Sequence, residues 1–396
     1  MSLARENRID LVRGLSLLVI FVDHSNLSFS GALQHSRGFC DAAELFVMMA
    51  GMSAALAYHP ASGAAGFRAT ASRTLRRSFK LYWIHLLMLA AVVAAVFLLP
   101  FIRDPALVRE WSLDKLAAQP VRYAVEAIFL RYLPAELDIL PLYMLLIAAV
   151  PLFFAAIDVA PRLALAASVA LWLLAGIFHL NLVDFSQPKG LWYFNPFSWQ
   201  LVFVCGLLAG LRVRQGQAPF AFSKPLFILA FVFCLVAIPA DLVIHLGEYG
   251  ETTPLRFLIS KTSEGPLRLI NALAIVYVVF NLDALQRLSP TGWLRPVFAA
   301  GRNSLPIFVL GEILSDIVTV SVFGREGIPL ALELLAVFVG VAILLGFALH
   351  RDRAKRRRSG KPASSLLVAS QPEPDYGPET TTEPPSIPDA RPNTAT

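Results

Sequence analysis

The sequence has few charged residues. They make up 16% of its 396 residues, against about 25% in soluble domains. Hydrophobic residues make up 56%, and long apolar stretches recur from one end of the chain to the other. Such a composition is typical of an integral membrane protein whose helices satisfy their own backbone hydrogen bonds in lipid. We therefore expect an all-α, polytopic membrane protein.

The chain also lacks the short motifs of several kinds of site. Its three cysteines, Cys40, Cys205 and Cys234, form no CxxC pair and no zinc pattern. There is no P-loop, no GxSxG elbow and no HExxH. We therefore expect no metal and no tightly bound cofactor. The net charge of +6 does not indicate a nucleic-acid partner, because the basic residues lie in short loops between apolar stretches.

About ten apolar segments are candidates for transmembrane helices. They cover residues 14–33, 42–58, 79–101, 138–157, 163–181, 198–212, 226–246, 266–285, 303–323 and 329–349. The second and sixth segments are short and contain glycine, which is compatible with a tilted or partly re-entrant course. An even number of spans places both termini on the same side of the membrane.

Basic residues predict which side that is. They concentrate near the N-terminus, after the second segment, and after the last segment, where the chain reads Arg351-Asp-Arg-Ala-Lys-Arg-Arg-Arg358. The alternate loops, among them residues 102–137, hold fewer basic and many acidic residues. By the positive-inside rule, both termini are predicted to be cytoplasmic, and the 102–137 loop is predicted to lie outside.

The chain divides into three predicted regions. Residues 1–350 form the membrane domain, and 351–361 form a basic juxtamembrane segment that is expected to touch anionic lipid headgroups. Residues 362–396 are rich in Pro, Ser, Thr and acids and are expected to be a disordered tail. Within the outer loop, Val121–Leu133 has the pattern of an amphipathic helix on the membrane surface.

The most informative polar residues lie in the first apolar segment. Asp23 and His24 are adjacent near its middle, where ionisable groups are costly unless they face a polar cavity or a partner. Arg13 precedes His24 by three turns and about 20°, so the two side chains share one face of the helix. We predict that His24 acts as a general base and that Asp23 and Arg13 complete the site. A polar pair that only packs against neighbouring helices is the alternative.

Further polar candidates lie on the predicted outer side. Asp41 and Glu44 share a face at the start of the second segment, where they either bind sugar hydroxyls or stabilise the helix N-terminus. Asp138 precedes another helix start. Trp199 and Gln200 lie in a run of aromatic and amide residues. Its rings either stack on sugars or anchor the helix at the membrane interface.

On the predicted cytoplasmic side, Arg302, Asn303 and Ser304 open the ninth segment. A free helix N-terminus with an arginine suits a phosphate group. The alternative is an ordinary capped helix with a positive-inside arginine.

Two acids lie deeper in the ninth segment. Glu312 and Asp316 are four residues apart and therefore share a face. They indicate either a polar cavity or a pairing with a buried cation such as Lys261 or Arg268, and the sequence does not decide between these.

Several of these motifs occur in the order found in one known family, and the chain resembles the OpgC family from about residue 5 to 350. The matching motifs are Arg8-Ile-Asp10-x-x-Arg13-Gly14 with Asp23-His24, Asp41-Ala-Ala-Glu44-Leu-Phe-Val with Gly51, Leu137-Asp138-Ile-Leu-Pro141-Leu-Tyr143, Phe194-Asn195-Pro196-Phe-Ser-Trp199-Gln200, and Gly301-Arg302-Asn303-Ser304-Leu305. The Arg-x10-His spacing is also similar to the wider acyltransferase-3 group of membrane proteins, where the pair is associated with acyl transfer.

The resemblance implies a bacterial inner-membrane O-acyltransferase. Such an enzyme would move a succinyl or similar acyl group from cytoplasmic acyl-CoA to hydroxyls of osmoregulated periplasmic glucans. The implied donor-binding residues are Arg13, Arg302, Asn303 and Ser304, and the implied acceptor-binding residues are Asp41, Glu44, Asp138, Trp199 and Gln200. The alternative is a transporter or flippase for the glucan or a lipid-linked sugar, with Asp23, His24 and Glu312 relaying protons.

Overall fold

The chain is all-α in the computed structural model, as its composition predicts. The structure describes residues 6–59, 64–98, 105–246, 257–322, 325 and 327–359. Within these residues, an isolated antiparallel bridge joins Val183 and Leu191 in a loop. The chain divides into one unit of residues 1–352 and a second of residues 353–396. The predicted tail, 362–396, lies outside the described residues.

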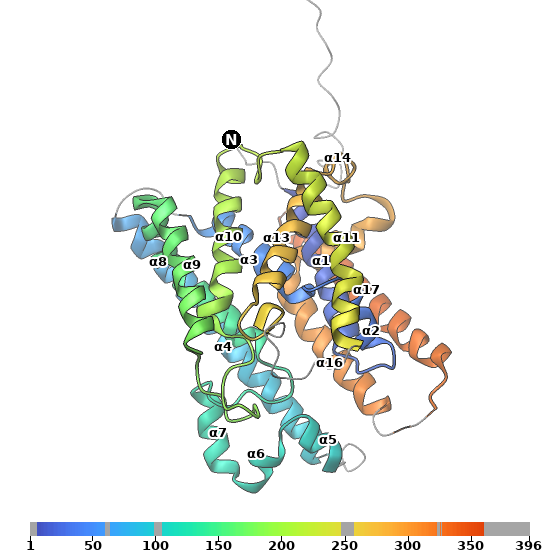
Figure 1. The fold of residues 1–396 in the computed structure, drawn as a ribbon. Coiled ribbons are helices and arrows are strands. Elements are labelled where there is room, and N and C mark those ends of the chain that lie inside the picture. Colours follow the sequence, from blue (N-terminus) through green and yellow to red (C-terminus); the bar gives the residue numbers. More distant parts are fainter. Residues whose placement is uncertain are drawn as a thin grey trace, which may run out of the picture. The chain divides into compact units, whose positions relative to one another are not determined.

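Each of the predicted apolar segments overlaps at least one helix of the described chain (Figure 1). The elements are α1 (Asn7–Asp23), α2 (Ser30–His35), α3 (Ala42–Tyr58), α4 (Ala64–Leu98), α5 (Pro105–Glu110), α6 (Asp114–Ala118), α7 (Pro120–Ile128), α8 (Ile139–Val159), α9 (Pro161–Ile177), α10 (Pro196–Arg214), α11 (Lys224–Leu246), α13 (Pro266–Asn281), α14 (Asp283–Gln286), the 3₁₀ helix η1 (Gly292–Leu294), α15 (Arg295–Arg302), α16 (Ser304–Val322) and α17 (Leu330–Ser359). The basic run after residue 350 continues α17 as helix.

Six of the described helices are long and apolar enough to cross a membrane, namely α4, α8, α10, α11, α16 and α17. Helices α3, α9 and α13 are shorter but also apolar. Helices α11 and α17 expose many large apolar side chains, among them Leu229, Val243 and Phe338. Faces of this kind suit lipid rather than water. The chain is therefore a membrane protein.

The first helix ends earlier than the sequence predicts. The apolar run predicts one helix over residues 14–33, but α1 ends at Asp23 and the short α2 follows from Ser30. The hydroxyls of Ser25 and Ser30 donate to carbonyls of the last turn of α1, at 2.6 and 2.9 Å. These bonds satisfy groups that a longer helix would have paired internally. His24 therefore lies at the end of α1 and not near its middle, which corrects the sequence prediction.

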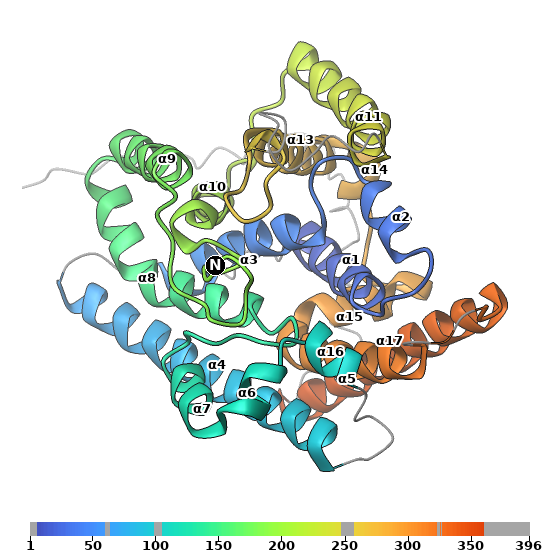
Figure 2. The same cartoon turned by 60° about the horizontal axis from the view of Figure 1, so that its bottom comes forward.

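Helix α1 is packed among α3, α15 and α16 (Figure 2). A glycine on each helix, Gly14 on α1 and Gly301 on α15, lets these two helices pack closely. A Cβ atom on Gly14 would lie 2.2 Å from the carbonyl oxygen of Val297, and one on Gly301 would lie even closer to that of Asp10. Only glycine lets the two backbones approach this far. The helix that carries Arg13 and His24 is thus held in place by backbone contact.

Glycine has the same purpose where α3 crosses α10. A Cβ atom on Gly51 would lie 2.2 Å from the carbonyl oxygen of Phe203, and one on Gly206 would lie 2.1 Å from that of Met48. Small residues of this kind let membrane helices pack through their backbones. The glycines that suggested a tilted or re-entrant course therefore mark a helix–helix crossing, and both helices are continuous.

The amphipathic helix predicted over Val121–Leu133 is present but shorter. Helix α7 ends at Ile128, and Leu130 has a positive φ of 58°. Val121, Ile128 and Phe129 are exposed. An exposed apolar stripe on a short surface helix suits the interface between lipid and water.

Candidate active site

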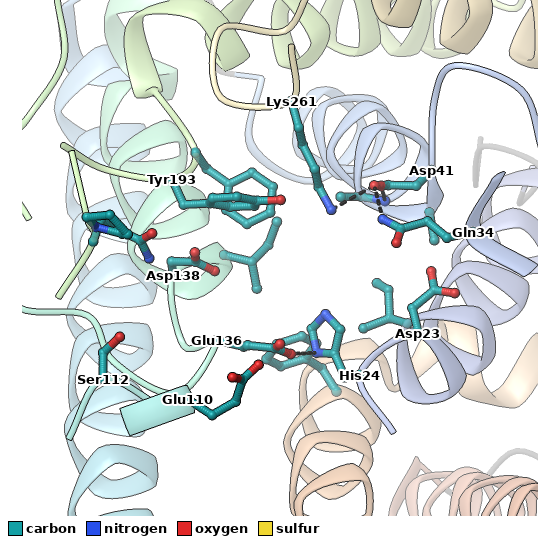
Figure 3. A pocket seen from close by; sticks show the side chains of 18 of the residues that line it. Asp23, His24, Gln34, Asp41, Glu110, Ser112, Glu136, Asp138, Tyr193 and Lys261 are labelled. Atoms are coloured by element: carbon teal, nitrogen blue, oxygen red, sulfur yellow. Dashed lines mark hydrogen bonds and ion pairs between the residues drawn. The ribbon is translucent and has the colours of Figure 1, made fainter. Parts of the chain in front are cut away.

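A cavity of about 770 Å³ lies where several connections between the long helices meet (Figure 3). It is framed by the end of α1, the start of α3, the start of α8, α5 and the loops before α10 and α13. All of these connections are ones that the charge pattern places on the outer side. The lining residues that carry polar groups are Asp23, His24, Gln34, Asp41, Arg109, Glu110, Ser112, Glu136, Asp138, Gln187, Tyr193 and Lys261.

His24 lines this cavity and is bonded to a carboxylate. Its Nδ1 lies 3.0 Å from Oε2 of Glu312, which is buried, and 3.5 Å from Oε2 of Glu136. Thr319 donates its hydroxyl to the His24 carbonyl oxygen at 3.2 Å. A carboxylate at Nδ1 fixes the tautomer with the proton on that nitrogen. The other ring nitrogen points into the cavity (Figure 3).

The partner of Glu312 is therefore His24. The sequence had suggested Lys261 or Arg268 as possible partners, and both cations lie against other acids. Asp316 is partly exposed one turn further along α16.

Asp23, the neighbour of His24, also lines the cavity. Its Oδ2 lies 2.7 Å from Nη2 of Arg37, so the pair closes the loop between α1 and α3. Asp23 does not contact Nδ1 of His24, and its partner comes from this loop and not from a neighbouring long helix.

Asp41 and Glu44 stabilise the N-terminus of α3, which is one of the two roles that the sequence allowed. They form a capping box for α3: Ala43 N–H donates to Asp41 at 2.8 Å, and Asp41 N–H donates to Glu44 at 3.0 Å. Arg268 donates to Glu44 Oε1 at 2.7 Å and to Asp41 Oδ2 at 3.1 Å. Asp41 also faces the cavity, whereas Glu44 is fully buried beneath it.

Lys261 extends into the cavity and contacts Asp41. Its Nζ lies 2.7 Å from Oδ2 of Asp41 and 5.5 Å from the centre of the Tyr193 ring. Burial opposes the ionisation of Asp41, but the charges of Lys261 and Arg268 hold the pKa of this carboxyl well below its usual range. The Lys261–Asp41 pair is therefore charged.

Trp199 holds the loop that carries Lys261. Its indole N–H donates to the Lys261 carbonyl oxygen at 2.9 Å, and Trp172 donates to the Glu264 carbonyl oxygen at 2.8 Å. Gln200 accepts from the Ser168 hydroxyl at 2.6 Å and donates to the Ser168 carbonyl oxygen at 2.8 Å, which joins α10 to α9. Neither Trp199 nor Gln200 lines the cavity.

Acids and aromatic rings make up much of the remaining cavity wall. Asp138 is buried at the start of α8, and Glu110 and Glu136 come from the preceding segment. Burial, reinforced by the charge of Glu136, raises the pKa of Asp138 to about 7. Tyr193 and Phe194 line the cavity from the aromatic run in which the sequence had selected Trp199 and Gln200.

Three turns before His24, Arg13 donates from near the middle of α1 to the hydroxyls of Ser53, at 3.2 Å, and of Ser304. Ser304 and Glu312 both belong to α16. Arg13 and His24 therefore both contact α16, as expected for side chains on one face of α1.

A small pocket continues from the cavity toward the start of α16. Its volume is about 10 Å³, and it shares Ile139 and Phe308 with the cavity. Arg77 and Ser304 line it as well. The passage between the cavity and the Arg13 region is therefore nearly closed.

Arg302 and Asn303 lie outside both spaces. Arg302 forms a two-point ion pair with Asp352, at 2.9 and 3.0 Å. Asn303 is buried and donates to the Ala299 carbonyl oxygen at 2.8 Å. Of the three residues that open α16 in the sequence prediction, Ser304 is the one that lines the small pocket.

The sequence did not select Glu136, Tyr193 or Lys261 as site residues. The signal it contained was weak: an acid and a lysine in loops predicted to lie outside, and a tyrosine in an interfacial aromatic run. Glu136 has a positive φ of 56°. This backbone conformation sets the direction of its side chain, and the spacing of residues in the sequence does not predict it.

Comparison with known proteins assigns the family. The model of the family described as OpgC protein matches residues 5–356. No curated protein matches the chain. The matched range contains every residue of the cavity and the small pocket. Because the match covers nearly the whole sequence, this chain belongs to the OpgC family.

Proposed function

We propose that this chain is an inner-membrane O-acyltransferase that moves a succinyl or similar acyl group from cytoplasmic acyl-CoA to hydroxyls of periplasmic glucans. The observation that carries the proposal is the pair of His24 Nδ1 and Glu312 Oε2, 3.0 Å apart, at the wall of a large polar cavity. A histidine oriented by a buried carboxylate is the usual arrangement of a general base. Family membership supports the class of reaction.

The acceptor would bind in the cavity. Carboxylates of Glu110, Glu136 and Asp138 can accept hydrogen bonds from sugar hydroxyls, and the rings of Tyr193 and Phe194 can pack against sugar faces. A volume of about 770 Å³ lies within the range of pockets that enclose one small ligand, so the cavity has room for a sugar unit of the acceptor. The acceptor-binding role thus includes Asp41 and Asp138 from the sequence prediction. Trp199 supports it through the loop that carries Lys261.

The acyl donor would approach from the opposite side, past Arg13, Arg77 and Ser304. Arg77 lines the small pocket and has no carboxylate partner among the described residues, so its charge is available to an anionic group of the donor. Ile139 and Phe308 separate this pocket from the cavity. Both side chains must move before a thioester can reach His24.

The chemical step then follows from the position of His24. Its free ring nitrogen removes the proton from an acceptor hydroxyl, and the hydroxyl oxygen attacks the thioester carbonyl carbon. Lys261 is our candidate for stabilising the oxyanion that forms. Collapse of this intermediate breaks the carbon–sulfur bond, and the protonated His24 returns the proton to the leaving thiolate. The products are an ester on the sugar and free CoA.

The test compares periplasmic glucans from a deletion strain complemented with wild type, with His24→Ala or with His59→Ala. His59 is a matched control, because it also pairs with an acid, Asp158 at 3.1 Å, but does not line the cavity. Mass spectrometry should find acyl groups with wild type and His59→Ala and none with His24→Ala. Normal acylation in the His24→Ala strain, at equal protein levels, would contradict the proposal.

A transporter with a proton relay is the second candidate, and the contact between His24 and Glu312 is also compatible with it. The glucan found in the periplasm distinguishes the transporter from the acyltransferase. A transport-deficient variant would leave the periplasm without glucan, whereas an acyltransferase variant would leave unsubstituted glucan there.

A further inference from the structure

A second groove lies apart from the cavity, between α4, α16 and α17. Its volume is about 570 Å³, and apolar side chains form most of its walls. The walls are open to the surroundings, since Leu87 is 65% exposed and Ile313 is 45% exposed. A long apolar groove on the outside of a membrane protein is shaped for a hydrocarbon chain.

The ionisable residues of this groove are separated along its length. Lys80 and Arg351 line one end, and Asp316 lines the other. The ion pair of Arg302 with Asp352 places the start of α16 next to Arg351. The small pocket is lined both by Ser304, at the start of α16, and by Arg77, one turn before Lys80 on α4. The start of α16 therefore lies beside this part of α4. The two cations therefore lie together at the end where α16 begins.

The length of the groove matches one leaflet. Its lining on α16 runs from Leu305 to Asp316, which is about 17 Å at 1.5 Å per residue. Half of a hydrocarbon core of about 30 Å is close to this length. An acyl chain whose head group lies at the basic end would thus reach the acidic end near the centre of the bilayer.

We propose that the groove binds one anionic glycerophospholipid from the leaflet at its basic end. The phosphate lies between Lys80 and Arg351, and one acyl chain lies along α16. Charge fixes the direction, because an anionic head group at the other end would meet the carboxyl group of Asp316. Apolar walls provide the chain's contacts, and the two cations select anionic over zwitterionic head groups.

The experiment uses the full chain in nanodiscs that contain equal amounts of phosphatidylglycerol and phosphatidylcholine. Native mass spectrometry after release counts the lipids that the protein retains. Each basic residue near an anionic lipid contributes roughly fivefold in affinity. Wild type should therefore retain phosphatidylglycerol in preference, and Lys80→Gln with Arg351→Gln should lower this preference by roughly 10- to 30-fold.

Two further variants test the location of the site. Lys224→Gln with Arg287→Gln removes two exposed basic residues outside the groove and should leave the preference unchanged. Ala91→Phe fills the groove at a lining position and should reduce retention of both lipids. The proposal is overturned if the two double variants behave alike, if Ala91→Phe retains lipid as wild type does, or if the retained molecule is a free fatty acid.

Discussion

His24 meets two carboxylates with different surroundings. Glu312 is buried and lies 3.0 Å from Nδ1, whereas Glu136 lies at 3.5 Å with a side chain that is 62% exposed. A buried, closely placed carboxylate orients an imidazole more firmly than an exposed one, because solvent competes less for its charge. Glu312 is therefore the residue that positions His24, and Glu136 is free to contact a ligand in the cavity.

Glu312→Gln should accordingly lower kcat by about 10² or more and change KM little. The amide keeps the shape of the side chain but removes the charge that stabilises a protonated His24, a loss known to be large in oriented histidine bases. Glu136→Gln should affect KM more than kcat. The measurement is acyl transfer to purified glucan by the protein in detergent.

The control for these variants is Glu333→Gln. Glu333 is also buried and accepts a hydrogen bond from the Ser28 hydroxyl at 2.6 Å, but it does not line the cavity. The Glu333→Gln variant should retain the wild-type kcat. A Glu312→Gln variant with unchanged kcat would show that the carboxylate does not position the base.

Among the elements, α3 and α10 depend most clearly on small residues. Gly51 and Gly206 bring the two backbones into contact, and the helices bury most of their side chains. Helix α3 also carries the capping box that presents Asp41 to the cavity. The position of one cavity wall is thus linked to how closely these two helices approach.

Gly206→Ala should lower the free energy of unfolding by roughly 1–3 kcal/mol, because its methyl group would overlap the carbonyl oxygen of Met48 and force the helices apart. Gly346→Ala is the matched control. Gly346 is also helical, but a Cβ there would have no atom within 4 Å. It should be neutral or stabilising by up to about 1 kcal/mol. Thermal unfolding in detergent measures both, and equal stability of the two variants would argue against backbone contact at the crossing.

On the scale of the whole molecule, the polar features separate by side. The cavity is built from the loops that the charge pattern places outside. Arg13 and Arg77 instead lie near Ser304, at the start of α16, away from these loops. An acyltransferase with a cytoplasmic donor and a periplasmic acceptor needs this arrangement. The orientation remains a prediction from the basic residues.

Cysteine labelling in intact cells tests that orientation. In a variant without the three native cysteines, Lys189→Cys, next to the cavity, should react with a membrane-impermeant maleimide. Gln217→Cys, in the loop after α10, should react only after the cells are permeabilised. Both positions are exposed. The reverse pattern of labelling would show that the cavity faces the cytoplasm.

Local features of the sequence determined the helices and the face that Arg13 and His24 share. Apolar composition marks a membrane helix wherever it occurs, and the 3.6-residue period fixes which side chains of one helix point the same way. The same features missed the early end of α1, because two serine hydroxyls replace the helix's own hydrogen bonds there. Short motifs, read together, were sufficient to indicate the family.

Only the tertiary structure decided which charges meet. His24 pairs with Glu312, 288 residues away, and Arg302 pairs with Asp352. Lys261 is brought into the cavity by a loop that Trp199 holds. Such pairs depend on how distant helices pack, and neither composition nor period contains that information. The sequence therefore determined the kind of protein, while packing decided which partners His24 and the other charged residues have.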